Sequence, residues 1–503
     1  MHGITADKSE NTDKTAKIEE IARRRGFFWM GSEIYNGLSG FYDYGHLGTL
    51  MKRKWENTWR DYFLGLDDNF FEIEPTDIMH EKVFIGSGHV KCFVDPVVKC
   101  KKCGNIERAD HILEDILKEN FEGLNPEALS ELMKKHKIKC EKCKGLLEEV
   151  KTFNMLFPLD IGVEKPQKAY LRGETAQGVY VNFARAFEQL RKHLPMGLAI
   201  VGKAFRNEIS PRNLLIRMRE LTQAELQIFF DPDKINQHPN FKEVEDYKLR
   251  LFIAENRKNE NIIEVSCKEL KGKLPEFYIY HMAVVQKFYL DVLKIPKEFF
   301  RFRELSQEEK AFYNKYHWDV ELKLSIGWKE VGGVHYRTDH DLSGHQKISK
   351  NDMSVNIDGK KILPHVLELS LGVDRNIFAL LDLFYEEEGK EKRIVFRFPR
   401  HLAPCDCAVF PLVSKQGLPE KAEEVKKLLQ SVKFSVFYDA SGSIGRRYRR
   451  VDEIGIPAAV TIDHQTFEDG TVTVRDRDSM KQERVAINKL PEFLAEFLRG
   501  REL

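Results

Sequence analysis

Apolar and polar side chains alternate at both ends of residues 197–230, and this pattern predicts two neighbouring β-strands. Turn-forming residues at 210–213 separate them. Successive side chains of a strand point to opposite faces, so one face is apolar, with Val201, Phe205, Ala224, Leu226 and Ile228. The other face carries Arg206, Glu208, Gln223, Glu225 and Gln227. Because charges are costly to bury beneath a core, we expect this polar face to line a cavity where ligands compensate them.

Periodic patterns predict further elements around this pair. Residues 50–63 carry an apolar stripe at helical spacing, which is typical of a core helix or of an interface helix. A strand at residues 364–372 places Glu368, Ser370 and Gly372 on one face and leads to Arg375 at a helix start. A strand is also expected at residues 70–74, and helices at residues 14–25, 179–190, 242–257, 276–293 and 376–384.

The last hundred residues alternate between strands and helices, which predicts a sheet with helices on its faces. Strands are expected at residues 408–412, 434–439, 458–462 and 471–475, and helices at residues 419–430, 444–454 and 490–498. The second of these helices begins with Arg446, Arg447, Arg449 and Arg450 around an aromatic residue. Arginine forks on phosphates and an aromatic ring for base stacking suit single-stranded RNA, and a solvated basic helix is the alternative.

Composition narrows the class of protein. The chain has 503 residues, of which 42% are hydrophobic and 32% charged, so we expect a globular protein of two or three domains. The formal net charge is +1, so any nucleic-acid contact must come from local clusters. No apolar run reaches the length of a membrane span, and the first residues include Asp7, Glu10 and Asp13 and lack an apolar signal core. We therefore expect a cytoplasmic protein with no membrane contact.

Two cysteine knuckles predict a metal site within residues 92–150. Cys100 and Cys103 form the first knuckle, and Cys140 and Cys143 the second. Four thiolates at this spacing suit a tetrahedral structural zinc with no open coordination position. A disulfide set is disfavoured in a reducing compartment, and the spacing does not resemble that of iron–sulfur ligands.

Several motifs together carry a resemblance to a known family. They are Phe-Arg-Asn-Glu-Ile-Ser-Pro-Arg at 205–212 with Arg-x-Arg-Glu at 217–220, Arg-Gly-Glu-Thr-Ala-Gln at 172–177, Arg-Thr-Asp-His-Asp-Leu at 337–342, and Glu-x-Ser-x-Gly-x-x-Arg at 368–375. They resemble class II aminoacyl-tRNA synthetases, and specifically glycyl-tRNA synthetases of the dimeric type, over nearly the whole chain and in family order. The loop 37–48, the helix 50–63 and the strand after it resemble motif 1, which implies a homodimer interface.

The resemblance implies an α+β catalytic domain with an antiparallel sheet, zinc-binding and helical insertions, and a C-terminal α/β anticodon-binding domain. The catalytic domain would comprise residues 1–91, 151–230 and 321–397. The zinc-binding insertion would be residues 92–150, the helical insertion residues 231–320, and the anticodon-binding domain residues 398–503.

The resemblance also implies the reaction and its residues. Glycine and ATP would form glycyl-adenylate, and glycine would then pass to its tRNA, with Mg²⁺ bridging phosphates near Glu330 and Glu368. Arg206 would hold the α-phosphate and the attacking carboxylate, while Arg217 and Arg375 would bind other phosphates of ATP. The catalytic residues would be Arg206 and Arg375. The ATP-binding residues would be Arg206, Asn207, Glu208 (on the adenine side), Arg217, Leu221, Glu330, Val331, Gly372 and Arg375, and the glycine-binding residues Arg108, Glu174, Glu225, Glu368 and Ser370.

Three residues depart from the family pattern, and alternative functions stay open. His46 and Gly173 replace prolines, and Leu221 replaces a phenylalanine that stacks on adenine, which predicts weaker ATP affinity than in aromatic relatives. The alternatives are an inactive synthetase-like accessory subunit, a class II synthetase for another amino acid such as proline, threonine or serine, and a zinc-ribbon RNA-binding module. The retained arginines and the Arg-Gly-Glu-Thr-Ala-Gln motif favour an active enzyme for glycine.

Overall fold

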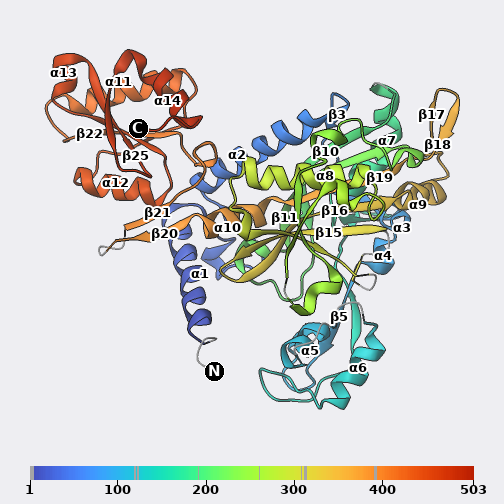
Figure 1. The fold of residues 1–503 in the computed structure, drawn as a ribbon. Helices are drawn as coiled ribbons and strands as arrows, with labels where there is room; N and C mark the ends of the chain where they lie inside the picture. Colours follow the sequence, from blue (N-terminus) through green and yellow to red (C-terminus); the bar gives the residue numbers. More distant parts are fainter. Residues whose placement is uncertain are drawn as a thin grey trace.

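The computed structural model describes residues 5–117, 121, 124–190, 192–259, 261–306, 309–310, 314–389 and 393–503. Its centre is a nine-stranded sheet in the order β13-β12-β14-β15-β16-β19-β11-β10-β3 (Figure 1). All pairings are antiparallel except those of β3 with β10 and of β12 with β14. The bounds are β3 Phe70–Glu72, β10 Met196–Phe205, β11 Glu220–Phe230, β12 Lys248–Phe252, β13 Ile263–Ser266, β14 Phe300–Glu304, β15 Tyr316–Leu324, β16 Gly327–Thr338 and β19 His365–Gly372.

Helices cover both faces of this sheet. On one face, α2 (His46–Phe63), α8 (Glu276–Lys287) and α10 (Val373–Leu383) pack into the main core with the apolar side chains of β11. On the other face, α7 (Ala176–Gln189) and α9 (His340–Ser349) pack over β10 and the end of β11. The predicted strand pair is therefore confirmed, and Gln223, Glu225 and Gln227 lie on the side of α7 and α9. Strand β10 ends at Phe205, however, so Arg206 and Glu208, which were predicted on its polar face, lie in the segment after the strand.

Helix α2 belongs to the core of its own chain. Trp55 and Trp59 on its apolar stripe are fully buried in the main cluster. Leu50 and Tyr62 are half-buried, so most of the stripe faces the core of this chain, and the core-helix alternative explains its pattern. His46 is the first residue of α2, a position where the missing N–H of proline costs nothing, so the replacement leaves the helix start intact.

The predicted helix at residues 242–257 is wrong. That segment contains β12 between short 3-10 turns, and the neighbouring β13 and β14 continue the central sheet. Lys248 and Arg250 alternate with the buried Leu249 and Leu251, a period of two that fits a strand. The helix expected at residues 276–293 is present as α8 followed by a π-helical segment, Phe288–Val292. The first helix, α1, spans Thr5–Arg25 and begins earlier than predicted.

Two smaller units extend from the central body (Figure 1). The insertion contains the sheet β6-β5-β7 and the helices α5 (Ala109–Leu117) and α6 (Pro126–Lys135), which enclose a small core. Its strands are β5 Val94–Lys99, β6 Ile106–Arg108 and β7 Lys151–Asn154. In the part of the chain that the structure describes, no helix combines the length and the apolar character needed to cross a bilayer.

The C-terminal unit has its own five-stranded sheet and its own core. The predicted alternation of strands and helices is confirmed, and β26 and α13 are additional. The sheet order is β23-β22-β24-β25-β26, with strands Val436–Tyr438, Cys407–Pro411, Ala458–Ile462, Thr471–Asp476 and Gln482–Ala486. The helices are α11 Leu418–Ser431, α12 Ile444–Glu453, α13 Gln465–Asp469 and α14 Leu490–Leu498.

Candidate functional site

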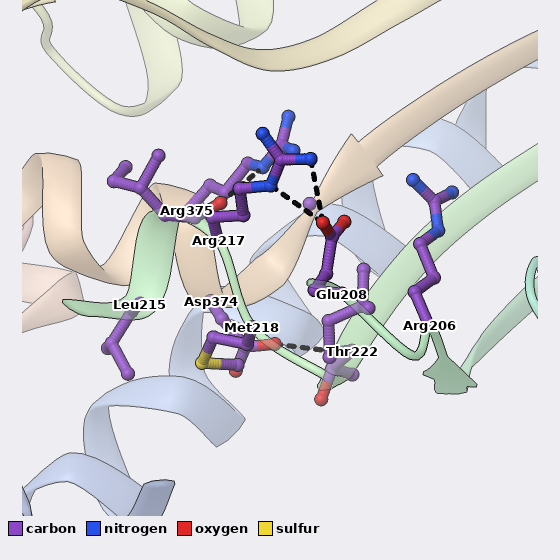
Figure 2. Close-up of a pocket in the computed structure, with 11 residues that line it drawn as sticks. Arg206, Glu208, Leu215, Arg217, Met218, Thr222, Asp374 and Arg375 are labelled. Carbon is purple, nitrogen blue, oxygen red and sulfur yellow. Dashed lines mark hydrogen bonds and ion pairs between the residues drawn. The ribbon is translucent and has the colours of Figure 1, made fainter. Parts of the chain in front are cut away.

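A two-lobed hollow lies where β11, β16 and β19 meet the start of α10. One lobe, of about 340 Å³, and a second, of about 560 Å³, share Arg206, Leu221, Gly372 and Arg375 in their walls. The first lobe also contains Glu208 and Arg217, and we call it the arginine lobe (Figure 2). The second contains Glu174, Glu225, Glu368 and Ser370, and we call it the carboxylate lobe. A ligand in one lobe therefore lies next to a ligand in the other.

Three guanidinium groups line the arginine lobe, with Arg217 and Arg375 close together and Arg206 on the other side of Glu208 (Figure 2). Arg217 donates from Nε to Glu208 Oε2 at 2.7 Å, and Arg375 donates from Nε to the carbonyl of Ile216 at 2.9 Å. Arg206 donates from Nε to the carbonyl of Gly173 at 2.9 Å. Arg217 is paired with Glu208 and Arg375 with Glu330, and a phosphate group can replace either carboxylate as the partner of its guanidinium. Three guanidinium groups around one hollow therefore suit a polyanion such as a triphosphate.

One carboxylate ties the motifs of the arginine lobe together. Asp374 at the start of α10 accepts hydrogen bonds from the Thr222 N–H on β11 and from the Tyr44 hydroxyl, the latter at 2.6 Å. Lys52 on α2 donates to Thr222 Oγ1 at 2.8 Å. These contacts fix β11 relative to the helix that carries Arg375, and so they hold the two sides of the lobe in register.

Strand register assembles the carboxylate lobe. Glu368 on β19 lies opposite His335 on β16 and Gln227 on β11. In the next row, Ser370 lies opposite Gly333 and Glu225. Side chains in these rows share one face of the sheet, so residues far apart in the chain meet there.

Arg337 neutralises most of the charge in this lobe. Its guanidinium is 1% exposed and lies 3.1 Å from Glu174, 3.0 Å from Glu368 and 2.9 Å from Asp341. Burial raises the pKa of a carboxyl group, but Arg337 and His335 outweigh this effect and lower the pKa of Glu368 to about 2. Against the same burial, Arg337 and His89 hold the pKa of Glu174 well below its usual range.

Glu225 is the exception among the three predicted carboxylates. It accepts hydrogen bonds from Ser370 Oγ at 2.8 Å and from Gln227 Nε2 at 3.3 Å. Among the described residues, no cationic side chain forms an ion pair with it, and it is 2% exposed. Burial, followed by the charges of Glu368 and Glu174, raises the pKa of Glu225 to about 7. The lobe thus presents one uncompensated acid to a ligand.

Sequence reasoning missed the groups that support these acids. Arg337 begins the motif at 337–342 and His335 lies two residues before it, but neither has a predicted role. Gln177 donates to Glu174 at 2.7 Å and to Asp341 at 2.8 Å. A usable signal was present, since His335 and Arg337 are two residues apart on one strand and must share a face. Their partners, however, depend on which strands become neighbours.

Some predicted ligands lie away from the expected positions. Arg108 does not line the carboxylate lobe as described, and instead pairs with Asp95 at 3.0 Å and with Asp110. Asn207 is held through its backbone N–H by the carbonyl of Met155 and is not part of either described lining. Of the two acids predicted near Mg²⁺, Glu368 is enclosed by cations, while Glu330 is 52% exposed and lies 3.0 Å from Arg375.

The glycine at position 173 has a packing reason. A Cβ atom there would lie 2.8 Å from the ring of Phe93 and 3.1 Å from Leu156, so a larger residue is excluded. The same ring lies 5.5 Å from the guanidinium of Arg206. Phe93 therefore lies near the guanidinium of Arg206 and occupies the space that a proline ring at position 173 would need.

The four predicted cysteines meet at one point of the insertion. Their sulfur atoms all lie within 4.8 Å of one another, with Cys100 and Cys143 at 3.5 Å and Cys103 and Cys140 at 3.6 Å. These separations are far longer than a disulfide bond, and they match the ~3.8 Å edge of a tetrahedron with Zn–S bonds of ~2.3 Å. Hydrogen bonds from the backbone at Cys103 and Lys102 lower the pKa of Cys100 to about 6, which favours the thiolate. The residues present fit a structural zinc.

The basic start of α12 divides into buried and exposed arginines. Arg447 is 1% exposed and donates to the carbonyls of Pro411, Leu412 and Gly442, so its predicted contact with RNA is withdrawn. Arg450 pairs with Asp439 at 2.6 Å. Tyr448 donates to or accepts from Thr461 and packs on Phe410, so it is not available for base stacking. The exposed members are Arg446 and Arg449.

Comparisons with known proteins agree on a family. Residues 406–497 match the family described as "Anticodon binding domain". A glycine–tRNA ligase of Pyrococcus horikoshii is 41% identical over 97% of this chain and 99% of its own length. Those of Pyrococcus furiosus and Methanothrix thermoacetophila are 40% and 36% identical, again over 97% of this chain, and over 100% and 98% of their own lengths.

Proposed function

The chain belongs to the glycine–tRNA ligase family of class II aminoacyl-tRNA synthetases, and we propose that its two-lobed hollow is where glycine meets ATP. It is an ATP-dependent ligase that activates glycine as glycyl-adenylate and transfers it to the 3′ end of tRNA. The observation that carries the site assignment is Glu225, a buried acid that forms no ion pair with any described residue and lines the same lobe as Arg206 and Arg375.

The carboxylate lobe suits the ammonium group of glycine. Glu225 and the hydroxyl of Ser370 would accept its hydrogen bonds, because Glu174 and Glu368 are already paired with Arg337. The carboxylate of glycine would then point to Arg206 in the shared wall. A Cβ atom at position 333 would meet His335, so glycine is required in this wall of the lobe. Discrimination against alanine would rest on steric exclusion of its methyl group, because a missing contact rejects an extra methyl only weakly.

The arginine lobe suits the triphosphate. Arg206 would hold the α-phosphate beside the attacking carboxylate, while Arg217 and Arg375 would bind phosphates further along ATP. The bond between the glycine carboxylate oxygen and the α-phosphorus forms as pyrophosphate leaves, so positioning and charge neutralisation supply the catalysis. Glu208 would turn to the adenine side once a phosphate takes Arg217. Glu330 is the acid best exposed to hold Mg²⁺, which would screen charge between phosphate oxygens.

The remaining assignments concern the periphery of the molecule. Cys100, Cys103, Cys140 and Cys143 would bind a zinc ion that stabilises the insertion. Arg446 and Arg449 on α12 would contact the anticodon region of a glycine-accepting tRNA. A homodimer and a cytoplasmic location remain part of the proposal on the strength of the family, and sedimentation velocity tests the first.

The decisive experiment is ATP–pyrophosphate exchange with single amino acids. We expect exchange with glycine and not with alanine, serine, threonine or proline. Well-folded protein that exchanges with none of them would favour the accessory-subunit alternative, and exchange with another amino acid would reassign the carboxylate lobe.

A further inference from the structure

A carboxylate of the insertion lies close to Arg217 of the arginine lobe. It belongs to none of the motifs that carry the family resemblance. Asp95 on β5 is 5% exposed, and its Oδ1 atom lies 3.0 Å from Arg108 Nη1. Its Oδ2 atom receives no hydrogen bond from any described residue, and it lies 3.9 Å from Arg217 Nη2. Leaving a buried carboxylate oxygen without a donor costs stability, so this atom calls for a functional reason.

Arg217 lies near two carboxylates. Both Nε and Nη2 are 2.7 Å from Glu208 Oε2, while Nη2 is 3.9 Å from Asp95 Oδ2, a distance too long for a hydrogen bond. A movement of about 1 Å would bring Nη2 within hydrogen-bonding range of Asp95. The guanidinium has five N–H donors in a fixed fork, so it can bind a carboxylate and a phosphate together.

We propose that Asp95 is a positioning residue for ATP: when the nucleotide separates Arg217 from Glu208, Asp95 accepts the guanidinium and holds it against the phosphate. This inference rests on the proposed function of the arginine lobe. Arg108 lies between Asp95 and Asp110 and offsets part of their negative charge, so Asp95 keeps the capacity to accept a second guanidinium.

The insertion is built to hold Asp95 in place. Strands β5 and β6 form a hairpin in which Val97 lies opposite Arg108, and Cys100 and Cys103 close its far end. Helix α5 makes a second contact with the segment between β10 and β11, since His111 Nδ1 lies 3.2 Å from Arg212 Nη2. Through this hairpin, an element outside the synthetase motifs becomes part of the nucleotide site.

The first test compares Asp95→Asn with Glu107→Gln, a matched carboxylate on the same hairpin. In glycine-dependent ATP–pyrophosphate exchange, Asp95→Asn should raise the KM for ATP about tenfold, as expected for losing one charge-assisted hydrogen bond, and leave the KM for glycine unchanged. Glu107→Gln should alter neither. An unchanged KM for ATP in Asp95→Asn overturns the proposal, and so does an equal rise in the KM for glycine.

The second test asks whether Asp95 acts through Arg217. In an Arg217→Ala background, Asp95→Asn should cause no further loss, because the group it positions is gone. A tenfold loss in both backgrounds would show that Asp95 acts elsewhere and would refute the inference.

Calorimetric titration separates this inference from the proposed function. Asp95→Asn should bind ATP about tenfold more weakly than the parent chain and bind AMP, which lacks the outer phosphates, equally well. Retained AMP binding also shows that the variant is folded. If the parent chain shows no exchange with any amino acid, the proposed function fails, and the ATP-to-AMP comparison still decides the role of Asp95. Equal weakening of both nucleotides would contradict it.

Discussion

Replacing Glu225 by glutamine should stabilise the ligand-free protein and abolish glycine activation. Burial, followed by the charges of Glu368 and Glu174, raises the pKa of Glu225 from 4.5 to about 7. Each pKa unit corresponds to ~1.36 kcal/mol, so ionising Glu225 in the folded protein at pH 8 costs roughly 3 kcal/mol. Glutamine is neutral and keeps the hydrogen bond from Ser370, but its NH₂ group would face Gln227, which offsets about 1 kcal/mol. The expected net gain is about 2 kcal/mol.

The pH dependence gives this prediction its sign. A carboxyl group whose pKa is raised by folding prefers the proton in the folded state. The loss of stability caused by ionising Glu225 is therefore absent below about pH 4.5. It grows between about pH 4.5 and pH 7 and reaches its full size above about pH 7. The advantage of Glu225→Gln should follow this window. The affinity for glycine in the parent chain should fall as the pH drops below about 7, because the proton and the ammonium group compete for Glu225.

Urea unfolding, monitored by tryptophan fluorescence, measures the stability of the catalytic domain, because Trp55 and Trp59 are buried in its core. The matched control is Glu220→Gln on the same strand, whose side chain lies at the surface near Lys203 and should change stability by less than about 0.5 kcal/mol. Exchange assays with glycine complete the test. The reasoning fails if Glu225→Gln is no more stable than the parent at pH 8, if its advantage is the same at pH 4.5, or if it still activates glycine.

The other predictions concern separate parts of the molecule. Arg337→Met should destabilise the catalytic domain by at least about 3 kcal/mol in urea unfolding, since it leaves three buried carboxylates without their shared cation; an effect near zero would contradict the network. Leu221→Phe should lower the KM for ATP several-fold through stacking on adenine, and an equal or tighter KM in the parent chain would count against this. Elemental analysis should find about one zinc per chain and a loss of it in Cys140→Ser, whereas a stable, metal-free parent protein would overturn the assignment. Arg446→Ala with Arg449→Ala should raise the KM for tRNA and weaken its salt dependence while leaving pyrophosphate exchange unchanged, and an unaltered KM for tRNA would remove α12 from the interface.

Patterns within short stretches were predictable. The alternation in residues 197–230 placed Glu225 and Gln227 on one face, and the structure has them there as part of β11. The two cysteine knuckles predicted a cluster that the structure assembles. The helix expected at residues 242–257 was wrong because charged residues, which suit a solvated helix, also occur on the open face of an edge-side strand such as β12.

The sequence by itself determined which chemical groups the site contains, because residue types and their spacing along the chain do not depend on how the chain folds. Only the tertiary structure decided which of these groups are neutralised. Arg337 reaches Glu174 across 163 positions of sequence, and Arg447 turns inward to carbonyls although Arg446 and Arg449 on the same helix are exposed. Such partners depend on strand order, register and packing, which are settled by the burial of the whole core. The sequence shows that a residue is charged, but it does not show whether a side chain, a ligand or water compensates that charge.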